Sequence, residues 1–302
     1  MSANKILFIG LSNVGDVIMT TPVMKTLHNK FPEALFDIVT DKRAAQLYEN
    51  CPFINHLYLK NKNKALRGVP ALLLQLWKNR YDIIVDVRSD GLAYLLRGGK
   101  RYTKWSAKSY GPHAVEEIMG VVARLHGDEP IPDTELWLAD ANQNYANKEL
   151  SVFPNKENLL ALSVGDCRKP EKSLNGKTYI ELLNTHKNDF SGVIFLGNEF
   201  ETAMTEEICR NVDIQYLNTV GNSLLDAAAL IEKACLYIGP DSGLGHVASA
   251  VKVPTISFFS SMRPERFRPW GGNSVCIQGA NDDARNISTN EVSNAIRSLL
   301  HE

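Results

Sequence analysis

Residues 239–251 combine glycines, an aspartate and a histidine in an order that could bind an anion. The segment reads Gly-Pro-Asp-Ser-Gly-Leu-Gly-His-Val-Ala-Ser-Ala-Val and lies between two apolar runs, Ala234–Ile238 and Thr255–Phe259. This order predicts a strand, a tight turn and a helix whose free backbone N–H groups face the turn. Asp241 and His246 could then hold a ribose or another sugar beside the anion. The same residues could instead serve the helix alone, with an N-cap aspartate or serine and glycines for packing.

A second strand–loop–helix pattern lies near the N-terminus, between Lys5 and Pro22. Its glycine-flanked loop holds Ser12 and Asp16, and Asp16 directly precedes a predicted helix at 17–29. An aspartate there could take a proton from a bound hydroxyl or cap the helix. The loop lacks the Gly-Lys-Ser/Thr ending of a P-loop and the Gly-x-Gly-x-x-Gly turn of dinucleotide-binding enzymes, which disfavours a Rossmann oxidoreductase.

Together the two segments resemble the bacterial heptosyltransferase family. These are inverting GT-B glycosyltransferases that transfer heptose from ADP-heptose to the inner core of lipopolysaccharide. The matching pieces are Ser-x-x-Gly-Asp-Val-Ile…Thr-Pro from Ser12, the Asp-Ser-Gly-Leu-Gly-His turn from Asp241 with Ala-Val-Lys-Val-Pro-Thr after it, and Pro…Arg…Pro-Trp-Gly at 264–271. They occur in order over nearly the whole chain. The resemblance implies an α/β GT-B fold, with two Rossmann-like domains whose parallel sheets face a central cleft.

The resemblance also implies roles for individual residues. Asp16 would be the general base, and Lys172 would clamp the leaving diphosphate. Arg168 or Lys169 could replace Lys172, because the family's Trp and Pro after this lysine are Leu174 and Asn175 here. Asp241 would meet the hydroxyls of the donor sugar. Further donor contacts are expected at Ser12, Gly15, Ser163, Gly165, Glu199, Asn222, Ser242, Gly243 and His246, although Glu199 could simply start a helix and His246 could support the loop.

A local excess of cations marks the first half of the chain. The net charge is −1, yet residues 42–108 hold 14 Lys and Arg against 4 Asp and Glu. Such a surface attracts phosphates, acidic sugars or an anionic membrane face, unless the cations only solvate helices and loops. Residues 97–105 are expected to form a ligand-contacting loop. The acceptor-binding candidates are Arg88, Arg97, Lys100, Arg101 and Lys104. The family often reads Asp-x-Gln-Gly where this chain has Asp86-Val-Arg-Ser-Asp-Gly91, which leaves the acceptor open.

Length and pattern indicate two domains. At 302 residues the chain suits two domains of about 150 residues each, and short apolar strands alternate with helices, as in parallel sheets. We expect an acceptor-binding domain at 1–150 and a donor domain at 151–302. The polar stretch 140–158 would be the linker between them.

Other features of the sequence give expectations about cofactors, partners and location. The sequence has neither Asp-x-Asp nor a Cys/His cluster, so a metal-independent reaction without a cofactor is expected. Five cysteines without a Cys-x-x-Cys pair indicate reduced thiols in the cytoplasm, and a pI of about 6.7 disfavours nucleic acid. No apolar run is long enough for a membrane span. The expected partners are a nucleotide-sugar donor and a lipopolysaccharide or other glycan acceptor, with peripheral contact to the inner membrane as a hypothesis.

Two other functions fit the same pattern. GT-B nucleotide-sugar epimerases share the fold but need no acceptor. A non-catalytic nucleotide-sugar binding protein would have no use for a base at Asp16.

Overall fold

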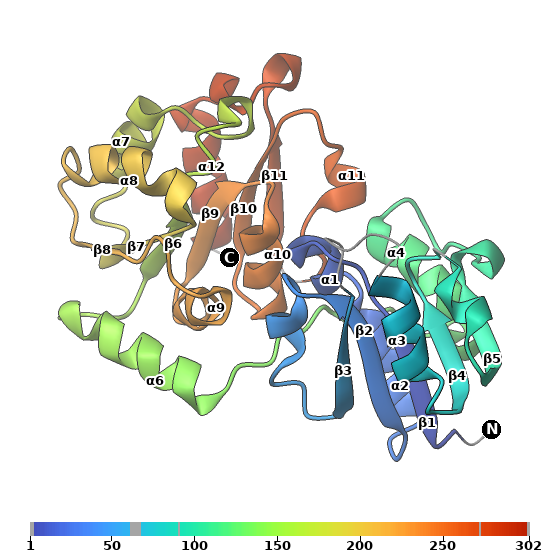
Figure 1. Cartoon of the computed structure of the whole chain (residues 1–302). Coiled ribbons are helices and arrows are strands. Elements are labelled where there is room, and N and C mark those ends of the chain that lie inside the picture. Colours follow the sequence, from blue (N-terminus) through green and yellow to red (C-terminus); the bar gives the residue numbers. More distant parts are fainter. Residues whose placement is uncertain (1–2, 61–67, 90, 272, 301–302) are drawn as a thin grey trace. The chain divides into compact units, whose positions relative to one another are not determined.

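The computed structural model describes residues 3–60, 68–89, 91–271 and 273–300. The chain divides into two compact units, Met1–Trp137 and Leu138–Glu302. Each unit is an α/β structure built on a parallel sheet (Figure 1). The α/β fold class is therefore confirmed for both halves of the chain.

Unit 1 contains a sheet in the order β3-β2-β1-β4-β5, with every paired strand parallel. The inner strands are buried on both faces, which explains their continuous apolar sequences. The strands are β1 (Lys5–Ile9), β2 (Leu35–Asp41), β3 (Ile54–Lys60), β4 (Tyr81–Asp86) and β5 (Gly98–Thr103). The α-helices are α1 (Val14–Ile18), α2 (Thr21–Lys30), α3 (Gly68–Leu76), α4 (Ala114–Met119) and α5 (Ala123–His126), with 3₁₀-helices η1 (Ala45–Tyr48), η3 (Leu92–Leu95), η4 (Lys104–Ser106) and η5 (Gly120–Val122).

Unit 2 contains a sheet in the order β11-β10-β9-β6-β7-β8, again parallel. The strands are β6 (Leu159–Ser163), β7 (Gly192–Leu196), β8 (Tyr216–Asn218), β9 (Leu236–Pro240), β10 (Thr255–Phe259) and β11 (Ser274–Gln278). The α-helices are α6 (Asp140–Glu149), α7 (Gly176–Thr185), α8 (Thr202–Cys209), α9 (Leu224–Glu232), α10 (Gly243–Ala250), α11 (Pro264–Phe267) and α12 (Thr289–Leu300). The 3₁₀-helices are η6 (Leu150–Val152), η7 (Pro170–Lys172), η8 (Glu199–Glu201), η9 (Ala280–Asp282) and η10 (Ala284–Asn286).

Both sheets reverse their strand order once. In unit 1 the chain runs outward from β1 to β3 and returns to add β4 beside β1. In unit 2 it runs outward from β6 to β8 and returns to add β9 beside β6. Ligands of open α/β sheets bind outside the carboxyl ends of the strands at such a reversal. The topology therefore directs attention to the loops after β1, β4, β6 and β9.

The helix predicted at 17–29 is two helices. α1 ends at Ile18, and α2 begins at Thr21 with Pro22 in its first turn. The proline lacks the N–H that would continue α1, and the hydroxyls of Thr20 and Thr21 donate to the carbonyls of Val17 and Ile18 at 2.6 and 2.8 Å. These bonds satisfy the carbonyls at the end of α1.

The predicted loop at 97–105 is wrong, because most of it is strand β5. Its two glycines are required for close packing against β4. A Cβ at Gly98 would lie 2.8 Å from Ile84 Cδ1, and one at Gly99 would lie 2.5 Å from the carbonyl oxygen of Asp82. Glycines that suggested a loop therefore permit an edge strand.

The domain boundary lies before the predicted linker. Residues 140–149 form α6, which belongs to unit 2 and packs against α9. Two polar contacts join these helices: Asn142 Nδ2 donates to Asp226 Oδ1 at 2.9 Å, and Gln143 Nε2 donates to Glu232 Oε2 at 2.7 Å. A polar helix that docks through hydrogen bonds has the same composition as an interdomain linker. The sequence pattern alone therefore does not distinguish a helix such as α6 from a linker.

Candidate functional site

The carboxyl ends of β1 and β4 bring two predicted residues together. Ser12 follows β1, Arg88 follows β4, and Arg88 Nη1 donates to Ser12 Oγ at 2.6 Å. The loop after β4 is fixed by buried Asp86, whose Oδ1 accepts from the backbone N–H groups of Arg88 and Ser89 at 2.9 and 2.6 Å. A cation and a hydroxyl thus meet where a ligand of this sheet would bind.

Asp16 lies in the first turn of α1, after Gly15 and not at the N-cap position. The N-cap is Asn13, whose side-chain Nδ2 donates to Asp16 Oδ2 at 2.8 Å. The carboxylate is half-buried and retains lone pairs for a substrate hydroxyl. Its position therefore suits a general base, and a carboxylate in a first turn also stabilises the helix dipole.

The basic segment around β5 divides into different roles. The Arg101 guanidinium donates to the backbone carbonyls of Ala93, Leu96 and Gly99 at 3.0, 2.8 and 3.1 Å. Arg101 therefore supports η3 and the turn that follows it, and its predicted acceptor contact loses support. The other three cations of this segment, Arg97, Lys100 and Lys104, have exposed side chains.

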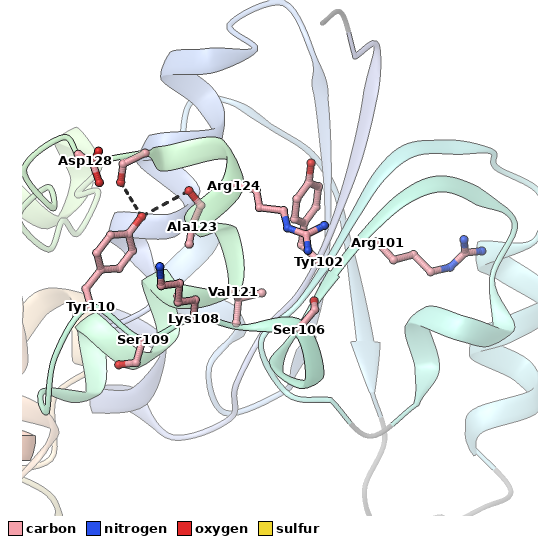
Figure 2. A pocket seen from close by; sticks show the side chains of 12 residues that line it. Arg101, Tyr102, Ser106, Lys108, Ser109, Tyr110, Val121, Ala123, Arg124 and Asp128 are labelled. Carbon is pink, nitrogen blue, oxygen red and sulfur yellow. Dashed lines mark hydrogen bonds between the residues drawn. The ribbon is translucent and has the colours of Figure 1, made fainter.

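A cavity of about 510 Å³ lies between β5, the loop after η4 and α5. Figure 2 shows the side chain of Arg101 pointing away from the other labelled residues, whereas Lys108 and Arg124 lie on either side of Val121. The wall also carries Tyr110, whose hydroxyl donates to the carbonyl of Gly127 at 2.6 Å. The sequence pattern did not indicate Lys108 or Arg124 as candidates. Arg124 belongs to a helix whose sequence shows only ordinary amphipathic character.

The carboxyl ends of β6 and β9 bring Lys172 and Asp241 together in unit 2. Lys172 ends η7, after β6, and Asp241 follows β9. Burial raises the pKa of Asp241, and the charge of nearby Lys172 opposes that shift. Burial also raises the pKa of the Cys276 thiol in strand β11, to about 11. A partly buried carboxylate near a cation is typical of a functional site.

The two alternative clamps are placed differently from Lys172. The Arg168 guanidinium pairs with Asp166 at 2.5 Å and lies 3.3 Å from the centre of the Phe200 ring. This pairing lowers the pKa of Asp166 to about 2. Lys169 is exposed. Of the three cations, Lys172 is the one whose charge acts on the Asp241 carboxylate.

A buried glutamate that the sequence analysis missed organises the loop after β6. Glu201 Oε2 accepts from Ser163 Oγ at 2.9 Å and from the N–H of Gly165 at 3.0 Å. Gly165 adopts φ +85°, so the turn requires glycine. The candidate Glu199 is exposed, and its expected contact with the donor stays a prediction. The Ser163 hydroxyl and the Gly165 N–H are bonded to Glu201, a carboxylate that the Gly-x-Glu spacing does not indicate.

Replacing Glu201 with alanine is expected to lower the free energy of unfolding by about 2–4 kcal/mol, because Ser163 and Gly165 would lose their buried acceptor. Burial raises the pKa of Glu201, and its hydrogen bonds partly oppose this. Because the folded-state pKa lies above that of the unfolded chain, stability falls as the pH rises from the ordinary glutamate range through the folded pKa. Urea unfolding across that range should show the slope in the wild type and not in Glu201→Gln. Exposed Glu199→Ala is the control and should change stability by less than about 0.5 kcal/mol.

The N-terminus of α10 carries the predicted anion site. Ser242 is its N-cap and Gly243 its first residue. The Ser242 hydroxyl is buried and makes no hydrogen bond of good geometry within the described residues, and the hydroxyl of Tyr237 is its polar neighbour. Buried hydroxyls are normally bonded, so this group and the free N–H groups beside it are suited to a bound oxyanion. His246 is buried one turn further along the helix.

Asn222 has a structural partner. Its side-chain amide donates to the hydroxyl of Tyr145 at 2.5 Å, which ties the loop before α9 to α6. Gly221, before it, adopts φ +99°. The predicted donor contact at Asn222 would have to use the remaining capacity of this amide or the backbone.

The structure describes residues 3–60, 68–89, 91–271 and 273–300, and two kinds of feature are absent from them. In these residues, no group of three or more His, Cys, Asp or Glu side chains is arranged to hold a metal ion. Nor does any helix in them combine the length and apolar character of a membrane span.

Known proteins share this architecture. Residues 72–295 match glycosyltransferase family 9 (heptosyltransferase). Lipopolysaccharide heptosyltransferase 3 of Escherichia coli (strain K12) is 25% identical over 295 residues, covering 88% of this chain and 86% of that relative. The family 9 glycosyltransferase from Veillonella parvula DSM 2008 superposes with a TM-score of 0.86 at 18% identity, covering 100% of this chain and 98% of that chain. E. coli ADP-heptose lps heptosyltransferase II gives a TM-score of 0.79 at 20% identity, covering 98% of each chain.

The solved structures confirm the GT-B fold class, and the family match confirms the resemblance noted in the sequence. The match to the family extends through most of both units. The chain is a glycosyltransferase and belongs to glycosyltransferase family 9, the heptosyltransferase family.

Proposed function

We propose that this enzyme transfers a heptose from ADP-heptose to a sugar hydroxyl of the lipopolysaccharide core, with inversion at the anomeric carbon. One observation carries the proposal: Lys172, Asp241 and the buried Ser242 hydroxyl at the N-terminus of α10 lie at the strand reversal of unit 2. The names of the relatives, which specify lipopolysaccharide and ADP-heptose, support the substrates.

The proposed reaction has one displacement step. Asp16 takes the proton of the acceptor hydroxyl, and the oxygen forms a bond to the anomeric carbon. The bond between that carbon and the diphosphate oxygen breaks, and ADP leaves with the electron pair. Lys172 and the N–H groups at 242–243 stabilise the negative charge that develops on the diphosphate. In this scheme no metal or other cofactor takes part.

The two units have different roles in the proposal. Unit 2 binds the donor, because the anion site of α10 and Lys172 belong to it. Unit 1 binds the acceptor through Asp16 and Arg88 and through the cavity with Lys108 and Arg124, whose cations suit an acidic or phosphorylated sugar. We place the reaction in the cytoplasm, a compartment that suits free thiols such as the exposed Cys167.

Two measurements test the function. Calorimetric titration should show binding of ADP and ADP-heptose, with UDP and GDP much weaker. Incubation with ADP-heptose and a lipopolysaccharide core lacking its terminal heptose should yield ADP and a longer core, whose new linkage is opposite in anomeric configuration to the donor.

Other outcomes would contradict the proposal in different ways. Tighter binding of a uridine or guanosine nucleotide would overturn the donor. An altered nucleotide sugar formed without any acceptor would indicate an epimerase. Binding without turnover of any glycan acceptor would favour a nucleotide-sugar binding protein.

A further inference from the structure

Unit 1 exposes a cluster of large apolar side chains from three neighbouring segments. α3 and the residue after it contribute Leu74 and Trp77, η3 contributes Tyr94 and Leu95, and η4 contributes Trp105. Trp105 is 68% exposed, although indole rings are usually well covered. We call these five residues the aromatic patch.

Direct contacts join the members of the aromatic patch. Trp77 Nε1 donates to the carbonyl oxygen of Leu95 at 2.8 Å, which joins the end of α3 to η3. The rings of Tyr94 and Trp105 stack with their centroids 5.2 Å apart and an interplanar angle of 18°. Tyr94 and Leu95 are neighbours in the chain, and Leu74 lies about one helical turn before Trp77. The five side chains therefore form one surface.

The segment of the chain that carries the aromatic patch is cationic. Residues 69–108 contain eight Lys and Arg against three Asp and Glu. Two of these carboxylates are already engaged, since Asp82 accepts from the N–H groups of Asn4 and Lys5 and Asp86 accepts from its own loop. The cations next to patch residues in the sequence are Lys78, which follows Trp77, and Lys104, which precedes Trp105, and both are exposed.

Exposed aromatic and aliphatic side chains next to lysines favour some partners of the aromatic patch over others. In a symmetric dimer, the same patch would face itself and bring its lysines near their own copies, which is unfavourable. A soluble glycan could stack on Tyr94 and Trp105 but would leave Leu74 and Leu95 exposed. Tryptophan and tyrosine favour the boundary between water and lipid, and each Lys or Arg near an anionic bilayer adds attraction.

We propose that the aromatic patch is a membrane-docking surface, on which Trp77, Leu95 and Trp105 enter the interface of a bilayer and the lysines contact anionic headgroups. The surface binds the bilayer from one side and does not span it. Docking requires neither donor nor acceptor, so it is separable from the transferase reaction.

The test is cosedimentation of the full chain with phosphatidylcholine vesicles that contain phosphatidylglycerol, beside vesicles of phosphatidylcholine alone. Binding to the anionic vesicles should weaken with added salt. Trp105→Ala should reduce the vesicle affinity roughly tenfold, because one indole leaves the interface. Lys78→Ala and Lys104→Ala should each reduce it about fivefold.

Tyr216→Ala is the matched control, because Tyr216 of unit 2 has the same exposed fraction as Trp77, 42%. It should leave vesicle binding unchanged. Thermal unfolding of Trp105→Ala should resemble that of the wild type, which separates loss of docking from loss of folding. Equal vesicle binding by the wild type and Trp105→Ala, or no binding at low salt, would overturn the proposal. So would a wild-type dimer that Trp105→Ala converts to a monomer.

Activity distinguishes this surface from the catalytic site. With a soluble core oligosaccharide as acceptor, Trp105→Ala should turn over at the wild-type rate. With lipopolysaccharide embedded in anionic vesicles, its rate should fall in proportion to the lost binding. Failure of transfer in both assays, with vesicle binding retained in the wild type, would contradict the proposed function and leave the docking surface intact.

Discussion

Replacing Asp16 with asparagine is expected to lower kcat about 10²–10⁴-fold, because the amide cannot accept the proton of the acceptor hydroxyl. The substitution preserves shape, and an asparagine oxygen can still accept the hydrogen bond that Asn13 donates at 2.8 Å. Affinity for ADP should stay at the wild-type value, since the proposed diphosphate contacts, Lys172 and the N–H groups at 242–243, lie in unit 2. Steady-state kinetics with a saturating acceptor and calorimetric titration with ADP measure the two effects.

The alternative role of Asp16 gives a different result. A carboxylate in the first turn of a short helix contributes about 0.3–1 kcal/mol through the helix dipole. If that were its only function, Asp16→Asn would lower the melting temperature slightly and retain kcat. Asn13→Ala is a useful control, because it removes the hydrogen bond to Asp16 and keeps the carboxylate. It should affect kcat much less than Asp16→Asn does.

The fold was largely predictable because its strands are buried on both faces. Continuous apolar runs such as 159–163 and 255–259 correspond to β6 and β10, and their alternation with helices implies parallel sheets. β5 was not predictable in the same way, since it is a polar edge strand whose glycines permit close packing on β4. α6 has the composition of a linker, because it docks by hydrogen bonds and buries little beyond Ala146.

The site was predictable where residues follow strand ends. Ser12 and Arg88 are far apart in the chain, yet β1 and β4 are neighbours, so their loops meet. Lys172 and Asp241 meet for the same reason at β6 and β9. The sequence does not reveal which polar groups the fold itself uses. Arg101 and Asn222 are engaged by backbone carbonyls and by Tyr145, and these partners depend on tertiary packing.

Replacing Lys172 with alanine is expected to lower kcat about 10²–10³-fold and to weaken ADP binding about tenfold. The loss in kcat should exceed the loss in affinity, because the diphosphate gains negative charge as its bond to the sugar breaks. Lys172 also opposes the upward shift that burial imposes on the pKa of Asp241, so the variant should raise this pKa further. NMR titration of the Asp241 carboxyl would detect that change without substrate.

Two neighbouring cations, Arg168 and Lys169, are the controls for the assignment of Lys172 as the diphosphate clamp. Lys169→Ala removes an exposed lysine three residues earlier, and Arg168→Ala removes a guanidinium that is already paired with Asp166. Both variants should retain most of the wild-type kcat and ADP affinity. A large loss in Lys169→Ala with normal activity in Lys172→Ala would move the clamp to the outer loop. It would also mean that the charge next to Asp241 serves the pKa of that carboxylate and not the departing ADP.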